Sequence, residues 1–199
     1  RNYLALLGWG LDETTTFLTT EALVRHFSLE RVSRNPAVFD EQKLRWMNGR
    51  YLRELEPAEL ARRLARLHGD RPGLQEAAAV AQEKLQTLAE FWPLAGFLVE
   101  RPQETDPRAW EKVMQDGAFQ RLAEARAALA EAEPFDRAEV ETALRGVVDR
   151  LGVKPKDVFQ PIRVAIAGTT VSPGIFESVA ALGREEALVR IDAALAQRR

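Results

Sequence analysis

The chain contains no cysteine and only two histidines. The absence of cysteine excludes a disulfide framework, thiolate catalysis and cysteine-ligated zinc. His26 and His68 lie far apart in the sequence, which argues against a histidine-based metal site or a Ser-His-Asp triad. Neither GxGxxG nor GxxxxGK[ST] occurs, so we do not expect a nucleotide-binding loop.

Long apolar runs are also missing. No run approaches the roughly 20 residues that a membrane-spanning helix needs, and no signal-peptide pattern opens the chain. We therefore expect a cytoplasmic protein with no membrane partner. The first residue is not Met and lies next to an apolar stretch, which predicts a piece of a longer protein.

The chain lacks the excess of positive charge that nucleic-acid modules usually have. Hydrophobic residues make up 46% and charged residues 29%, as in an ordinary globular protein, and the net charge is −2. The charges are uneven, however, because residues 43–53 hold four basic residues and no acidic one. Any binding of nucleic acid must therefore come from local patches.

The dominant hydrophobic periodicity is helical, and no β-alternation persists. We expect an all-α protein of two helical subdomains. The boundary is placed after residue 70, because residues 68–73 hold two glycines and a proline. The expected subdomains are 1–70 and 71–199, the second with a proximal part (71–151) and a distal part (152–199). The longer helices are expected at 40–52, 57–67, 74–91, 108–117, 119–132 and 137–151.

The helix expected from residue 40 carries two stripes. At 100° per residue the apolar stripe, expected in the core, is Leu44, Met47, Tyr51 and Leu55. A neighbouring stripe, within about 80°, holds three cations and an indole: Lys43, Trp46, Arg50 and Arg53. This stripe suits phosphates, with the indole available for stacking, and the alternative is a solvated charged face. Gly49 destabilises a helix interior by about 1 kcal/mol, so we expect a close approach to the backbone there.

A second candidate lies in residues 160–168. Pro161 fits the first turn of a helix, and Gly168 fits its left-handed end. Arg163 is the only charged residue in this stretch, so its guanidinium is either paired internally or directed at a partner.

A third candidate begins at Ser172. Ser172, Pro173 and Gly174 fit the N-cap, N1 and N2 positions of a helix. The free N–H groups of such a start can bind a phosphate or a base oxygen. The alternative is a capped helix without a ligand.

The order of the segments adds information that no single motif carries. The segments that decide it are NYLALLGWG (2–10), FSLERVS (27–33), FDEQKLRWMNGRYL (39–52), QPIR (160–163), SPGIF (172–176) and ALGREEALVRI (181–191). Together they resemble bacterial-type glutamyl-tRNA synthetases, from the segment after the KMSKS-type loop through the stem-contact region to the terminal helix. The resemblance covers the whole chain and is loosest over 73–148.

The resemblance implies a fold and an activity. The parent enzyme is a class I synthetase that activates glutamate with ATP and charges tRNA-Glu, and it reads the anticodon with an all-helical α-helix cage. Its HIGH and KMSKS signatures do not occur in this chain. We therefore expect no catalytic residue, cofactor or metal here, with ATP and Mg in a catalytic domain outside it. The expected partner is tRNA and not DNA, and the expected parent enzyme is a monomer.

The resemblance also implies two sets of site residues. The anticodon-binding set consists of Lys84, Arg163, Ser172, Pro173, Gly174 and Ile175. The set for the tRNA body consists of Lys43, Arg45, Trp46, Asn48, Arg50 and Arg53.

Lys84 departs from the family pattern. Aligned through TLAEF (87–91), it occupies a position where some members use arginine to read the third anticodon base. In the family, arginine there accompanies strict selection of tRNA-Glu, and glutamine accompanies tolerance of tRNA-Gln. Lysine can donate to a cytosine or uracil oxygen but lacks the planar fork of arginine. The expected partner is thus tRNA-Glu, with tRNA-Gln left open.

A non-catalytic helical interaction or adaptor module is the alternative function. Its best support is the slightly acidic net charge of −2. A hydrolase or transferase is disfavoured by the missing cysteine, the two unlinked histidines and the missing nucleotide loop.

Overall fold

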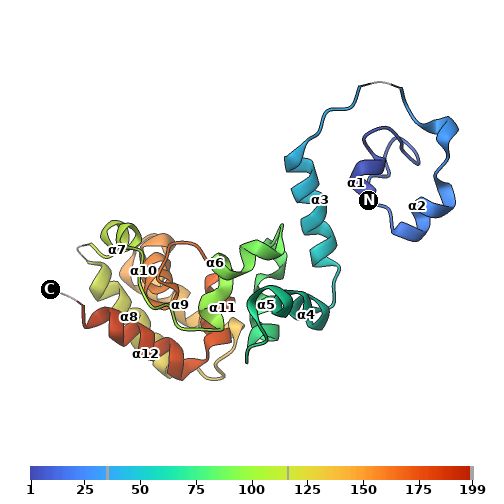
Figure 1. Cartoon of the computed structure of the whole chain (residues 1–199). Coiled ribbons are helices and arrows are strands. Elements are labelled where there is room, and N and C mark those ends of the chain that lie inside the picture. The colour runs from blue at the N-terminus through green and yellow to red at the C-terminus, as the bar shows by residue number, and fades with distance from the viewer. Residues whose placement is uncertain (35, 116, 198–199) are drawn as a thin grey trace.

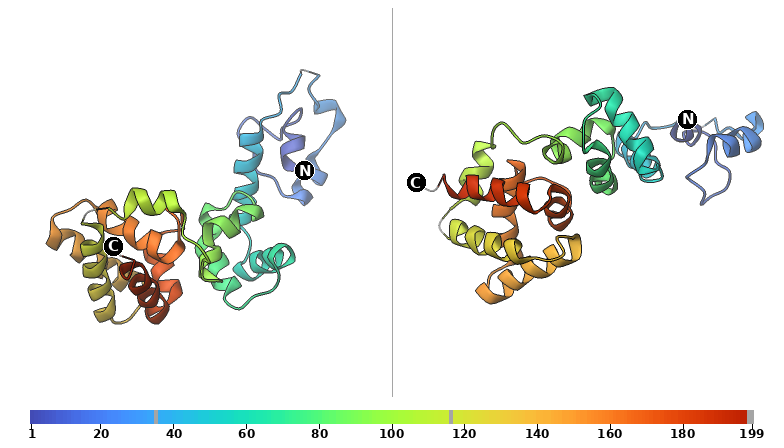
Figure 2. Two further views of the ribbon diagram at one scale, coloured as in Figure 1. Left: turned by 60° about the vertical axis from the view of Figure 1, so that its left-hand side comes forward. Right: turned by 90° about the horizontal axis from the view of Figure 1, so that it is seen from below.

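The computed structural model describes residues 1–34, 36–115 and 117–197, and within these ranges it contains helices and no strand. The expected all-α class is confirmed. Figures 1 and 2 show an elongated molecule in which three groups of elements follow one another from the N-terminus to the C-terminus. Among the described residues, no helix is long and apolar enough to cross a membrane.

The first group, called the N-terminal region, comprises residues 1–34 and 36–40. It holds three short helices: α1 (Asn2–Ala5), α2 (Thr20–His26) and η1 (Leu29–Arg31). Trp9, Leu18 and Leu23 form a small buried cluster. Tyr51 ties this region to the next one, because its hydroxyl donates to the Leu18 carbonyl at 2.7 Å.

The second group, called the middle bundle, is built around α3. Its elements are α3 (Glu41–Arg53), α4 (Pro57–His68), α5 (Leu74–Ala81), η2 (Gln82–Lys84), η3 (Leu88–Glu90), α6 (Phe91–Ala95) and η4 (Gly96–Leu98). Asp40 caps α3 as predicted, since its carboxylate accepts a hydrogen bond from the Lys43 backbone N–H at 3.0 Å. Pro57 begins α4 at a position where its missing N–H leaves no bond unmade.

The single helix expected over 74–91 is wrong. The chain leaves the helical region at Leu85, where ψ is 129°, and again at Thr87, where ψ is 156°. Thr87 and Glu90 form a capping box that starts a new helical segment. The Gln82 amide also donates to the Leu52 carbonyl at 2.9 Å, which fixes the break against the end of α3. A helical periodicity cannot reveal this long-range anchor.

The predicted subdomain boundary at residues 70 and 71 lies in the loop between α4 and α5. These helices share a cluster of buried residues that runs from Leu52 to Ala95. A larger cluster runs from Phe97 to Ala194. The division of the chain after residue 70 stays a prediction.

The third group, called the C-terminal bundle, surrounds α10. Its elements are α7 (Pro107–Val113), α8 (Ala118–Glu131), α9 (Arg137–Leu151), α10 (Pro155–Ala167), α11 (Ile175–Leu182) and α12 (Arg184–Leu195). Gly168 ends α10 with φ +71°, as predicted, and a Cβ there would lie 3.0 Å from the Glu104 carbonyl.

Two predicted helix starts are wrong. Because α10 begins at Pro155, Pro161 lies in its interior and not in its first turn. Helix α11 begins at Ile175 with Gly174 as its N-cap, so Ser172 lies in the preceding loop. Local composition fits a helix start at both positions, but α10 begins six residues before Pro161 and α11 begins two residues after Pro173.

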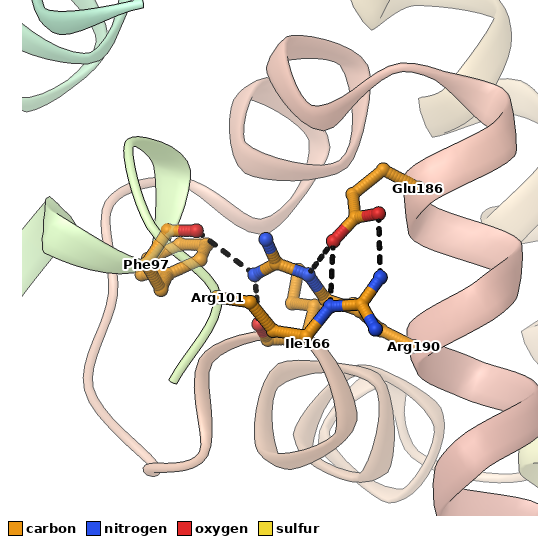
Figure 3. Close-up of polar contacts among 5 residues, drawn as sticks. All are labelled: Phe97, Arg101, Ile166, Glu186 and Arg190. Atoms are coloured by element: carbon orange, nitrogen blue, oxygen red, sulfur yellow. Dashed lines mark hydrogen bonds and ion pairs between the residues drawn. The ribbon is translucent and has the colours of Figure 1, made fainter. Parts of the chain in front are cut away.

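A buried arginine joins the middle and C-terminal bundles (Figure 3). Arg190 of α12 is 6% exposed, and its Nη1 donates to the carbonyls of Phe97 at 2.8 Å and Ile166 at 2.7 Å. Its Nε donates to Glu186 at 2.7 Å, and Arg101 donates to the same carboxylate. The hydrogen bond from Arg101 is the main reason why the pKa of Glu186 falls to about 2. The network compensates for burying a charge and fastens η4 to α10 and α12.

Candidate functional site

Three of the predicted anticodon residues meet at one point. Lys84 comes from the end of η2, Arg163 from α10, and Ser172 from the loop between α10 and α11. Arg163 Nε donates to Ser172 Oγ at 2.8 Å, and Lys84 Nζ donates to the Ser172 carbonyl at 3.1 Å. The middle and C-terminal bundles therefore each contribute a cation to this group, which we call the Ser172 cluster (Lys84, Arg163 and Ser172).

The Arg163 guanidinium carries a charge that no described residue of the protein neutralises. Burial lowers its pKa, and arginine nonetheless stays protonated at neutral pH. Within the described ranges no carboxylate pairs with Arg163, and its one protein acceptor is the neutral Ser172 hydroxyl. Its two terminal amino groups are thus available for hydrogen bonds to a ligand.

The loop under Arg163 is packed tightly. Ser172, Pro173 and Ile175 are buried, and Ser172 Oγ donates to the Pro173 carbonyl at 2.9 Å. The space beside Gly174 is taken by the Glu177 carboxylate, since a Cβ on Gly174 would lie 1.9 Å from Glu177 Oε2. The start of α11 is therefore already served by an acidic side chain.

The predicted cationic stripe of α3 divides into two groups. Arg50 lies over the Phe17 ring at 4.3 Å, and the sequence pattern had not indicated that contact. Among the described residues, the side chains of Lys43, Trp46 and Arg53 form no hydrogen bond or ion pair. Lys43 is exposed, and Trp46 is 46% exposed.

Arg45 and Asn48, the two remaining residues predicted to contact the tRNA body, bind the segment that follows Lys84. Arg45 forms an ion pair with Glu90, and Asn48 Nδ2 donates to the Gln86 carbonyl at 2.5 Å. The close approach predicted at Gly49 is made by the protein itself, because a Cβ there would lie 3.0 Å from the Leu85 carbonyl. This face of α3 therefore positions the segment that immediately follows Lys84.

Arg190, which fastens the middle and C-terminal bundles together, is not among the residues predicted from the sequence. It occurs among Ala187, Ile191 and Ala194, with the i, i+3, i+4, i+7 spacing of a buried helix face. A charge in that register predicts a buried, hydrogen-bonded cation, so the signal was present in the sequence.

Comparison with known proteins shows which family the chain belongs to. A model of the anticodon binding domain matches residues 51–195, which include the whole Ser172 cluster. The chain belongs to the anticodon-binding domain family.

This anticodon-binding domain is similar to part of several glutamate–tRNA ligases. It is 38% identical to that of Mycolicibacterium vanbaalenii, with 96% of the chain and 41% of the relative covered. It is 39% identical to that of Herpetosiphon aurantiacus, with 98% and 42% covered. The chain thus spans about two fifths of the length of these curated relatives.

Solved structures agree with the fold. A glutamate tRNA ligase from Elizabethkingia meningosepticum superposes with a TM-score of 0.82 at 18% identity, over 100% of this chain and 40% of that one. The enzyme from Elizabethkingia anophelis gives 0.78 at 18% identity, over 98% and 40%. At this identity the likeness concerns the fold alone.

Proposed function

We propose that this chain binds tRNA and reads its anticodon, as part of a glutamate–tRNA ligase that charges tRNA-Glu with glutamate using ATP. The observation that carries the proposal is Arg163, a partly buried guanidinium with a neutral protein partner, next to Lys84 in a domain of the anticodon-binding family. The glutamate, ATP and Mg sites are assigned to a catalytic domain outside the chain. We further propose that the whole enzyme is cytoplasmic and monomeric.

The Ser172 cluster supplies donors for base edges. Arg163 offers its terminal amino groups as a planar fork, which suits a pair of base acceptors. Lys84 has three N–H donors, of which one is engaged by the Ser172 carbonyl, so two remain for a base oxygen. Pro173 and Ile175 are buried and hold this loop in place, so an unstacked base would meet it at Gly174, which is partly exposed.

The α3 stripe is proposed to contact the body of the tRNA. Three of its side chains are available for phosphate or sugar contacts: Lys43, Trp46 and Arg53. Arg50 lies over the Phe17 ring and adds a further positive charge to this surface. Arg45 and Asn48 belong to this surface, and they also hold the segment after Lys84. Lys43→Gln should weaken every tRNA equally and reduce the salt slope of binding by about 1.

The experiment for the proposed function is a gel-shift titration with transcribed tRNA-Glu and an unrelated RNA hairpin, repeated over a range of salt concentrations. We expect a dissociation constant in the range of about 1 µM or weaker for tRNA-Glu, because the chain holds only part of the enzyme. Binding should weaken as salt rises, since phosphate contacts release counterions. Equal binding of the hairpin, or binding that ignores salt, would contradict the proposal.

An adaptor module is the second candidate, and two observations favour it. The net charge is −2, and the N-terminal region exposes apolar side chains such as Val24, Leu29 and Val38. The same titration separates the two candidates, because an adaptor that has lost RNA binding gives no shift at high protein concentration.

A further inference from the structure

Pro161 creates an unusual position for one arginine. In the interior of α10, Pro161 has no N–H for the Asp157 carbonyl four residues earlier. Arg121 of α8 replaces that donor, since its Nε donates to the Asp157 carbonyl at 2.9 Å. Gly117 leaves room for the guanidinium, because a Cβ there would lie 2.6 Å from Arg121 Nη1. The fold thus fixes Arg121 through a neutral acceptor.

Most arginines of the C-terminal bundle are neutralised by carboxylates. Those with ion pairs are Arg126, Arg137, Arg145, Arg150, Arg184 and Arg190. In the described part of this bundle, the arginines without an ion pair are Arg108 in the first turn of α7, Arg121 and Arg163. Arg121 and Arg163 both lie against α10 or on it. Among the described residues, neither charge is paired with a carboxylate.

A groove of about 580 Å³ opens at Arg121. Lys112 and Lys156 add two further cations to its lining, and Asp157 is the single carboxylate among the described residues that line it. Neither lysine forms an ion pair among the residues that the structure describes. The described lining residues therefore carry an excess of two positive charges, in a chain whose net charge is −2.

The residues that line the groove lie close in sequence to the Ser172 cluster. At 100° per residue, Lys156, Gln160 and Arg163 lie within about 60° of one another on α10. Gln160 and Thr170 line the groove, and Thr170 precedes Ser172 by two residues. Gln160 Oε1 is buried and accepts no hydrogen bond from the described residues, which leaves an acceptor without a donor.

We propose that this groove binds the sugar–phosphate backbone of RNA beside the anticodon. Arg121, Lys112 and Lys156 contact phosphate oxygens, and the Gln160 amide turns its Oε1 toward the groove to accept a hydrogen bond from a ribose 2′-hydroxyl. Phosphates match the excess of cations, and the 2′-hydroxyl is the donor that an RNA backbone brings next to them. The inference rests on the proposed function and extends it to a surface outside the Ser172 cluster.

The phosphate contacts are tested with the double variant Lys112→Gln/Lys156→Gln. Arg145→Gln/Arg150→Gln is the matched control, because it also removes two positive charges from the bundle and neither residue lines the groove. The dissociation constant of tRNA-Glu is measured over a series of salt concentrations. We expect the lysine variant to reduce the salt slope by about 1.4, since each single-strand phosphate contact contributes about 0.7. The control should keep the wild-type slope.

The ribose contact is tested with Gln160→Leu and a tRNA-Glu whose anticodon loop carries 2′-deoxyriboses. One hydrogen bond predicts that the deoxy loop weakens wild-type binding roughly 2- to 12-fold. The same loop should not weaken the Gln160→Leu variant any further. An equal loss in both proteins overturns the ribose contact, and a thermal melt of each variant verifies folding.

The outcomes separate this inference from the proposed function. If the wild-type chain does not bind tRNA-Glu, both are overturned. If it binds with anticodon selectivity, and Lys112→Gln/Lys156→Gln keeps the wild-type salt slope, the groove is not a phosphate site and only this inference is lost.

Discussion

Lys84 and Arg163 approach the same serine, but they offer different chemistry to a base. Arg163 presents a rigid planar fork, and Lys84 presents a compact ammonium on a flexible stem. The Lys84 ammonium donates to the Ser172 carbonyl at 3.1 Å, and this hydrogen bond fixes its position. It cannot form the pair of parallel hydrogen bonds that an arginine can form with a base. At the scale of single residues, selectivity for the third anticodon base should therefore be lower than an arginine would allow.

Lys84→Arg should sharpen this selectivity. A bidentate base contact is worth about 1–3 kcal/mol of discrimination, so we expect the preference for tRNA-Glu over a third-base variant to rise by about 1 kcal/mol. The measurement is the ratio of the two dissociation constants, with Lys154→Arg, outside the cluster, as the matched control. An unchanged ratio would show that residue 84 does not read this base.

At the scale of elements, α3 and the segment after Lys84 form one unit. Arg45 and Asn48 bind Glu90 and Gln86, and Gly49 lets the Leu85 backbone approach the helix. The position of Lys84 thus depends on a helix that lies over 30 residues earlier in the chain.

Gly49→Ala tests this unit. The added Cβ would lie 3.0 Å from the Leu85 carbonyl and 3.2 Å from Gln86 Cα, which are backbone atoms. We expect a loss of about 1 kcal/mol in the free energy of unfolding and weaker anticodon selectivity. Gly146→Ala in α9 is the control: with no neighbour within 4 Å, it should stabilise by about 0.5–1 kcal/mol. Urea unfolding of both variants measures the difference, and an equal gain would contradict the account.

Local sequence signals predicted elements well where caps and periodicity agree. Asp40, Pro57 and Gly168 mark helix ends as expected. The predictions failed where a residue distant in the sequence determines the backbone conformation. Gln82 binds the end of α3 and fixes the helix break before Leu85, and Arg121 supplies the hydrogen-bond donor that Pro161 lacks. For the site, family resemblance placed Lys84 with Arg163, because spacing alone cannot join residues so far apart in the sequence.

At the scale of the whole molecule, the Ser172 cluster exists because two bundles hold a fixed orientation. Arg190 binds carbonyls of η4 and α10, and Glu186 joins it to Arg101 (Figure 3). This network lies at the same junction that Lys84 crosses to reach Ser172.

Glu186→Gln should change how stability depends on pH. The folded-state pKa of Glu186 is about 2, below its ordinary value of 4.5, so its contribution is present above about pH 4.5 and is lost as pH falls toward 2. The free energy of unfolding of the variant should therefore fall less than that of the wild type over this range. Urea unfolding at several pH values provides the comparison, and identical pH profiles would rule out this role.

The central claim is that Arg163 reads the anticodon, and it is tested by measuring how tightly wild-type and Arg163→Ala chains bind tRNA-Glu and an anticodon-substituted tRNA-Glu. The account predicts that the wild type prefers the natural anticodon and that Arg163→Ala loses most of this preference while it keeps salt-dependent binding. A variant that folds and retains the full wild-type preference would contradict it.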